Sequence, residues 1–168
     1  LALVGRNGSG KSTLLRTIVG DLRPAAGDLR VWVDGVRYLP QRLDVLDDAA
    51  SVVDNVRRFA PSATVNAVRA RLAKFLFTGE RAEHLAATLS GGERFRAVLA
   101  ALLSAEPPPH LLLLDEPTNN LDLASVRQLT QALEAYEGAL IVASHDEPFL
   151  ASIGADRGLE LSRDARTS

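Results

Sequence analysis

The segment from Gly5 to Ser12 has the composition of a loop that holds phosphate groups. It reads Gly-Arg-Asn-Gly-Ser-Gly-Lys-Ser and matches the pattern G-x-x-x-x-G-K-[ST]. Its glycines let backbone N–H groups turn toward an anion, and the helix expected after Gly10 presents its positive N-terminal end to the same anion. In such a loop Lys11 reaches the β- and γ-phosphates of a nucleotide, and the Ser12 hydroxyl ligates Mg²⁺. The residues predicted to bind nucleotide here are Gly5, Arg6, Asn7, Gly8, Ser9, Gly10, Lys11, Ser12 and Thr13.

Two adjacent carboxylates follow an apolar run later in the chain. Residues 111–114 are four leucines, and Asp115 and Glu116 come next. Acidic residues at the carboxyl end of a buried strand lie where α/β sheets bind ligands. Asp115 is suited to hold Mg²⁺, and Glu116 to polarise a water molecule for attack on a γ-phosphate. A strand ending in Asp-Glu is a weak signal alone, and the phosphate loop in the same chain strengthens it.

A third motif, Leu89-Ser-Gly-Gly-Glu93, precedes a helical pattern. A lone Ser-Gly-Gly is most often a loop with a helix cap. Here it opens a predicted helix from Ser90 to Ser104, whose first turn carries free backbone N–H groups. The chain would then have two helix ends that attract anions, and Ser90, Gly91 and Gly92 are candidates to bind phosphate.

The pattern of apolar residues predicts an α/β fold with a mainly parallel sheet, because short buried strands alternate with helices. The expected strands are residues 1–4, 29–33, 111–114 and 139–143. The expected helices are residues 12–19, a helix capped by Ser51, a helix that ends at Gly79, the helix from Ser90, and residues 125–136. The helix ending at Gly79 is predicted from an apolar stripe at helical spacing, formed by Val65, Val68, Leu72, Phe75 and Leu76. Residues 164–168 are expected to be frayed.

Composition excludes several kinds of site. The 168 residues include no Cys, which rules out disulfides, thiolate zinc sites and a cysteine nucleophile. Net charge is −2, so charge gives no reason to expect nonspecific binding to nucleic acid or membranes. No segment approaches the ~18 apolar residues of a membrane span, so we expect a cytoplasmic domain without membrane insertion. Only two of the 19 basic residues are lysines, Lys11 and Lys74.

Taken in order, these motifs resemble those of the ATP-binding cassette (ABC) ATPases along nearly the whole chain. Residues 5–12 resemble the Walker A loop, 111–116 Walker B, 89–93 the family signature and 120–122 the D-loop. Gln41 resembles the Q-loop glutamine and His145 the switch histidine, although each alone is a weak signal. The resemblance implies a P-loop NTPase core at residues 1–42 and 109–163. It also implies an inserted helical subdomain at residues 43–108 that carries the signature.

The resemblance further implies a reaction shared by two cassettes packed head to tail around ATP and Mg²⁺. Glu116, His145 and Gln41 would be catalytic, and Ser12, Gln41 and Asp115 would hold the metal. The signature residues 90–92 would contact the γ-phosphate of the ATP bound by the partner cassette. That partner would be a second cassette of the same longer chain or another copy of this one.

Within the family, the chain is most similar to the ABC-F type, whose members are tandem cassettes linked to the ribosome. The run from Asp115 to Asp122, the signature ending in Glu93 and the stretch 144–150 carry this similarity, and other short runs resemble C-terminal cassettes of actinobacterial members. The chain lacks an initial Met, the strands that precede Walker A in the family and an aromatic that stacks on adenine. We therefore expect a cassette truncated at its N-terminus.

Two other functions remain open from the sequence. The chain could be the ATPase subunit of a membrane transporter, with membrane-spanning subunits as partners. It could instead be a module that holds ATP without cleaving it, although the presence of Glu116 and His145 argues against this. In every case we expect weak or no ATPase activity from the isolated chain.

Overall fold

The computed structural model describes residues 1–119 and 121–162. They form two compact units. The first contains residues 1–41, 110–119 and 137–162, and the second contains residues 42–109 and 121–136. Asn120 of the D-loop motif and the C-terminal segment expected to be frayed lie outside the described residues.

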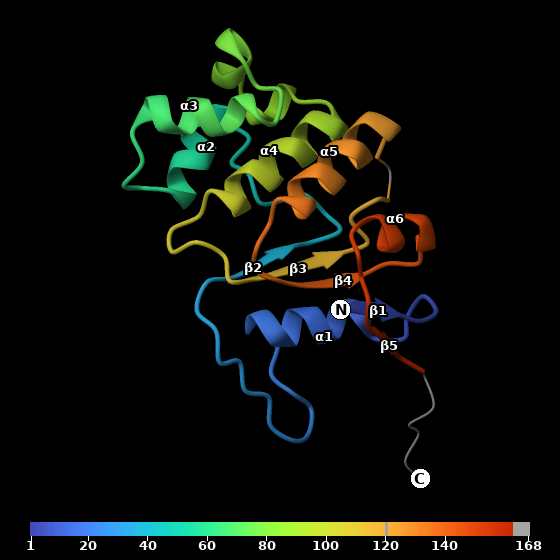
Figure 1. The fold of residues 1–168 in the computed structure, drawn as a ribbon. Coiled ribbons are helices and arrows are strands. Elements are labelled where there is room, and N and C mark those ends of the chain that lie inside the picture. Colours follow the sequence, from blue (N-terminus) through green and yellow to red (C-terminus); the bar gives the residue numbers. More distant parts are fainter. Residues whose placement is uncertain (120, 163–168) are drawn as a thin grey trace. The chain divides into compact units, whose positions relative to one another are not determined.

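The first unit is built on a five-stranded sheet in which every neighbouring pair of strands is parallel. The strands are β1 (Ala2–Val4), β2 (Val36–Leu39), β3 (Leu111–Asp115), β4 (Ala139–Ala143) and β5 (Gly158–Glu160). Their order across the sheet is β2-β3-β4-β1-β5, and Figure 1 shows them side by side. This confirms the predicted α/β class.

The apolar run at residues 111–114 forms the inner strand β3, whose five residues are all buried. The helix α1 (Lys11–Val19) packs on one face of the sheet, where Leu15 is fully buried and forms a cluster with Leu3 and Leu113. Burying leucine side chains of this kind stabilises the fold by about 1.5–3 kcal/mol each. The helix predicted at residues 12–19 is therefore confirmed, and it fixes the phosphate loop that precedes it.

The strand predicted at residues 29–33 is wrong. These residues form no regular structure, and the alternating side chains are exposed, with Trp32 at 85%. A period-2 pattern forms a strand only where a neighbouring strand accepts its hydrogen bonds. Among the described residues the pairing instead begins at Val36, opposite Leu111. The short helix α6 (Glu147–Ser152) and strand β5 were not predicted.

The second unit is helical in its described part. Its elements are α2 (Val52–Phe59), α3 (Val65–Ala73), the 3-10 helices η1 (Gly79–Glu83) and η2 (Ala86–Thr88), α4 (Gly91–Leu103) and α5 (Leu123–Glu134). Val56, Phe95 and Leu129 are fully buried in it. The predicted cap at Ser51 is confirmed, because its side chain accepts a hydrogen bond from the Asp54 N–H. The unit includes α5, which the expected helical segment 43–108 does not.

The apolar stripe predicted for one long helix is interrupted. Helix α3 ends at Ala73, and Leu76 adopts a left-handed φ of 66° with half of its side chain exposed. The chain reverses there, and the Phe77 N–H donates to the Leu72 carbonyl at 3.1 Å. Phe77 is buried as a result. A left-handed residue that closes such a turn is a normal helix ending, which helical spacing alone does not reveal.

None of the helices within residues 1–119 and 121–162 is both long and apolar enough to cross a membrane.

Candidate functional site

The carboxyl ends of four parallel strands bring the predicted residues of the first unit together. The phosphate loop follows β1, Gln41 lies just after β2, Glu116 follows β3 and His145 lies just after β4. Parallel strands place these ends at one edge of the sheet, where α/β folds bind ligands. A cavity of about 330 Å³ opens there. Its lining residues are Asn7, Gly8, Gly10, Lys11, Ser12, Thr13, Gln41, Glu116, Asn119 and His145.

The phosphate loop needs glycine at its first position. Gly5 has a φ of 148°, and a Cβ atom there would lie 2.5 Å from the Leu161 carbonyl oxygen. At the other end of the loop, α1 begins at Gly10 without a side-chain cap and without an acidic residue in its first turn. The other α-helices within the described residues all begin with a side-chain cap. The N–H groups of α1 are therefore left for an anion.

Lys11 and Glu116 form a buried ion pair in the cavity. The Lys11 Nζ donates to the Gly5 carbonyl at 2.7 Å and lies 3.5 Å from the Glu116 Oε1, with both side chains under 10% exposed. The other carboxylate oxygen accepts a hydrogen bond from the His145 Nδ1 at 2.8 Å. His145 is largely exposed. Glu116 is thus a carboxylate held between a cation and an imidazole at the wall of the cavity.

The backbone at Glu116 is strained. Its φ of 47° is in the left-handed region, which costs a residue with a side chain about 1–3 kcal/mol. Two hydrogen bonds hold it there. The Glu116 N–H donates to the Ala143 carbonyl at 2.7 Å, and its own carbonyl accepts from the Asn119 N–H at 3.1 Å. The turn after β3 therefore fixes the direction of the Glu116 side chain.

Asp115 lies next to this carboxylate and has one oxygen without a partner. Its Oδ2 accepts a hydrogen bond from the Tyr38 hydroxyl at 3.0 Å, and burial together with the Asp115 charge raises the pKa of Tyr38. Its Oδ1 is buried and has no hydrogen-bond partner among the described residues. Such an oxygen is suited to a cation or to a water molecule bound by one.

These oxygens fit Mg²⁺ only as part of a larger ligand set. The Ser12 hydroxyl, the Gln41 amide oxygen and Asp115 are all hard oxygen donors, as Mg²⁺ prefers. Within the described part of the chain, no group of three or more His, Asp or Glu residues could hold a metal ion. Mg²⁺ is commonly bound by one or two protein oxygens together with substrate phosphates, and the residues present fit that arrangement.

Two residues of this site were missed by sequence reasoning. Asn119 lines the cavity, and Tyr38 holds Asp115. Tyr38 is adjacent to Leu113 in the register between β2 and β3. Strand β2 is not among the strands predicted from the sequence, so no local pattern indicates that the Tyr38 hydroxyl lies beside the end of β3. The remaining loop residues, Arg6 and Ser9, bond to each other through the backbone at 3.0 Å.

The signature residues begin α4 in the second unit. Ser90 and Glu93 form a capping box, in which the Ser90 Oγ accepts from the Glu93 N–H and the Glu93 carboxylate accepts from the Ser90 N–H. Arg81 lies 3.4 Å from the same carboxylate. The capping box uses two N–H groups of the first turn. The N–H groups of Gly91 and Gly92 lie between them and have no hydrogen-bond partner among the described residues.

The capping box predicts an acid-dependent contribution to stability. The Ser90 backbone N–H, followed by the Ser90 side chain and the Arg81 charge, holds the pKa of Glu93 below its ordinary value of 4.5. A carboxyl with a lowered pKa stabilises the fold above its unfolded pKa and loses that effect as pH falls through the folded pKa. We expect Glu93→Gln to reduce the loss of stability below pH 4.5, measured by urea unfolding across that range. Equal acid sensitivity in both proteins would contradict this role.

Gly92 is required by the neighbouring helix. A Cβ atom on Gly92 would lie 2.8 Å from the Ser125 Oγ of α5, and Ser125 is fully buried with that oxygen unpartnered among the described residues. We expect Gly92→Ala to lower the free energy of unfolding by about 1–3 kcal/mol through overpacking. Ser125→Ala in the same chain should restore most of it, because the remaining Ser125 Cβ is 4.0 Å away. Additive effects of the two substitutions in urea unfolding would exclude this contact as the cause.

Comparisons with known proteins agree with these features. The family model for the ABC transporter matches residues 1–119. The chain is 39% identical over 159 residues to the probable ATP-binding protein YheS of Escherichia coli K12, covering 93% of this chain and 24% of that protein. It is 39% identical over 155 residues to the ATP-binding protein Uup of Haemophilus influenzae, covering 89% of this chain and 24% of that protein.

Two further comparisons extend the similarity. The chain is 36% identical over 162 residues to the ABC transporter F family member 4 of Arabidopsis thaliana, covering 93% of this chain and 22% of that protein. Its fold matches a dimeric bacterial ABC transporter cassette with a TM-score of 0.78 at 23% identity, covering 95% of this chain and 79% of that one. The chain therefore spans about a quarter of the length of these curated relatives. Since the family model covers well over half of its residues, the chain belongs to the ABC transporter family and is an ATPase cassette of that family, with relatives of the ABC-F type.

Proposed function

We propose that this chain binds ATP with Mg²⁺ and hydrolyses it in a site shared with a second cassette, as part of a ribosome-associated ABC-F protein. The observation that carries the proposal is the arrangement of Lys11, Glu116 and His145 at the uncapped start of α1. It combines an anion site with a proton acceptor. The relatives YheS, Uup and the F family member support the ABC-F part.

Glu116 is the general base in this proposal. Its carboxylate takes a proton from the attacking water, and the oxygen of that water forms the new bond to the γ-phosphorus. The bond from the γ-phosphorus to the oxygen that bridges the β- and γ-phosphates breaks, and ADP leaves with that oxygen. Lys11 supports the phosphates, and their charge competes with Glu116 for the lysine ammonium group. Nucleotide binding would therefore draw Lys11 away from Glu116, one of whose two side-chain contacts would be lost. His145 remains to orient the carboxylate.

Mg²⁺ would be held by Ser12, Gln41 and the free oxygen of Asp115, together with the nucleotide. When bound, it supplies positive charge that offsets the negative charge of the phosphate oxygens. Tyr38 keeps the Asp115 carboxylate in place by its hydrogen bond. Asn7, Gln41 and Asn119 are the residues lining the cavity whose side-chain amides can orient water or phosphate.

The second cassette would supply residues 90–92 to this ATP. The backbone N–H groups of Gly91 and Gly92 at the start of α4 are suited to a γ-phosphate. A solved structure with the same fold is a dimeric cassette, which supports a paired arrangement. A pair of cassettes would then contain two complete sites. Each site would combine the phosphate loop of one cassette with the signature residues of the other.

Mixing two inactive variants tests the shared site. Lys11→Ala disables the phosphate loop, and Gly91→Asp places a negative charge at the start of α4, where an added Cβ atom meets nothing within 4 Å. In a head-to-tail pair, a mixed dimer keeps one intact site, so an equal mixture should regain about a quarter of wild-type phosphate release. A mixture no more active than either variant alone would show that the site is complete within one chain.

Binding to ribosomes tests the ABC-F part of the proposal. The full-length protein containing Glu116→Gln should sediment with ribosomes when ATP is present and remain in the supernatant without ATP. If it sediments instead with membranes carrying a membrane-spanning partner, the protein is the ATPase subunit of a transporter. This experiment does not test ATP hydrolysis. The mixing experiment, which measures phosphate release, tests that part of the proposal separately.

A further inference from the structure

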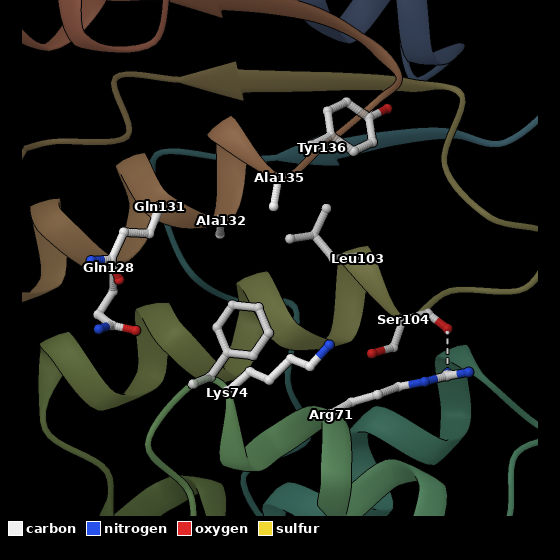
Figure 2. A pocket seen from close by; sticks show the side chains of 10 residues that line it. Arg71, Lys74, Leu103, Ser104, Gln128, Gln131, Ala132, Ala135 and Tyr136 are labelled. Atoms are coloured by element: carbon white, nitrogen blue, oxygen red, sulfur yellow. Dashed lines mark hydrogen bonds between the residues drawn. The ribbon is translucent and has the colours of Figure 1, made fainter.

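A second cavity, distinct from the phosphate-loop site, lies within the helical unit. It has a volume of about 440 Å³, within the range of small-molecule sites. The C-terminal end of α3, the C-terminal end of α4 and one face of α5 surround it, as Figure 2 shows. The lining side chains that carry the argument are Arg71, Lys74, Phe75, Gln128, Gln131 and Tyr136. None of them belongs to the motifs assigned above.

Two of the side chains that line this cavity are held in place by hydrogen bonds to backbone carbonyls. The Arg71 guanidinium donates to the Ser104 carbonyl at 3.3 Å, drawn as a dashed line in Figure 2. The Tyr136 hydroxyl donates to the Pro109 carbonyl at 3.1 Å, and burial raises the pKa of that hydroxyl. Its polar group is therefore satisfied by the backbone. The ring is fixed as an apolar surface before any ligand arrives, which lowers the entropic cost of binding.

The charges in the cavity are both positive. The Lys74 ammonium group has no hydrogen bond or ion pair among the described residues, and no Asp or Glu lines the cavity. Figure 2 shows its amino group directed toward Leu103 and Ser104. Glu106 accepts hydrogen bonds from the backbone N–H and the hydroxyl of Ser62 at 2.9 and 2.8 Å. These two hydrogen bonds, and then the Arg71 charge, hold the pKa of Glu106 below its ordinary value. Two cations that share a cavity repel each other, so the site favours an anionic ligand.

The other lining groups suit a flat ring. Phe75 and Tyr136 supply aromatic surface, and the small side chains Ala132 and Ala135 leave room beside α5. Gln128 and Gln131 each offer a donor and an acceptor on the face of α5 that lines the cavity. A cation for phosphate, an aromatic ring for stacking and an amide for a base edge are the groups by which proteins bind single nucleotides.

We propose that this cavity is a second nucleotide site, which takes a phosphorylated nucleoside with its phosphate on Lys74 and Arg71 and its base beside Phe75. The ligand is either a free nucleotide or an unpaired nucleotide of single-stranded RNA, since both present the same phosphate and base. The proposal does not depend on ATP hydrolysis, because no residue of the phosphate loop or the signature contributes to this cavity.

The test is an NMR titration of the 168-residue chain with adenosine 5′-monophosphate, repeated with an adenine hexaribonucleotide. The side-chain amide signals of Gln128 and Gln131 should shift, and they should shift equally in Lys11→Ala, which disables the phosphate loop. Lys74→Ala should weaken this binding by about tenfold or more, the loss expected for a hydrogen bond from a charged group. Arg127→Ala removes an exposed cation from α5 that does not line the cavity, and it should change nothing.

Comparing the two ligands shows whether the cavity takes a free nucleotide or a nucleotide of single-stranded RNA. Tighter binding of the hexaribonucleotide, still dependent on Lys74, identifies RNA, whereas equal binding identifies a free nucleotide. The proposal is overturned if the shifts are confined to residues 5–13, or if Lys74→Ala binds as well as Arg127→Ala. It is also overturned if inorganic phosphate alone produces the same shifts at the same concentration, because the base would then contribute nothing.

Discussion

Replacing Glu116 with glutamine is expected to abolish ATP turnover while ATP binding persists. The amide keeps the size of the side chain and the same strained backbone, but it cannot accept a proton from water at neutral pH. General-base catalysis contributes about 10²–10⁴-fold to a rate, so phosphate release should fall by that factor. The measurement is phosphate release by the paired cassette, with binding followed by calorimetry.

A matched substitution controls for this result. Glu137→Gln changes an exposed carboxylate of the same unit that does not line the cavity, and its activity should equal that of the unmodified protein. Normal phosphate release by Glu116→Gln would remove Glu116 as the base. His145 and the Asp115 oxygen that has no partner among the described residues would then be the remaining candidate proton acceptors.

Lys11→Ala is expected to weaken ATP binding by about tenfold to a hundredfold. Lys11 is the one lysine among the residues that line the cavity. A hydrogen bond from a charged group contributes about 1.5–3 kcal/mol to binding, so losing the Lys11 ammonium group lowers ATP affinity by that amount. Calorimetric titration with ATP measures the loss. Arg23→Ala removes an exposed cation from the loop after α1 and should leave ATP affinity unchanged.

Lys11→Ala is also expected to lower the stability of the fold. Removing one member of a buried ion pair costs about 3–5 kcal/mol, because the other charge stays buried. Glu116 would be left with His145 as its remaining partner. The double variant Lys11→Ala with Glu116→Gln contains no such charge and should recover thermal stability without recovering affinity. Recovery of both would show that Lys11 acts on the fold rather than on the nucleotide.

Local chemistry explains which parts of the fold could be predicted. The Ser51 and Ser90 caps depend on residues within one helical turn, and both were found from the sequence. The leucines of β3 are buried on both faces, so their unbroken apolar run was sufficient evidence for a strand. Residues 29–33 have an equally clear pattern, but a strand also needs a neighbour, which the local sequence does not specify.

In the candidate site, too, the parts set by local motifs could be predicted and the parts set by strand pairing could not. Its loop and carboxylates could be predicted because each is a short motif at the end of a strand, although their roles in catalysis stay predictions. The contact between Tyr38 and Asp115 joins residues 77 positions apart and depends on the pairing of β2 with β3. The positive φ of Glu116 likewise follows from hydrogen bonds to Ala143 and Asn119, and no residue preference predicts it.

The left-handed backbone at Glu116 and the buried ion pair with Lys11 depend on each other. Glycine would adopt that backbone conformation without penalty, but it would leave the Lys11 ammonium group buried without its carboxylate. The ion pair therefore offsets the cost of holding a residue with a side chain in the left-handed region. A substitution that relaxes this turn cannot be neutral for the phosphate loop, because it also removes the charge that neutralises Lys11.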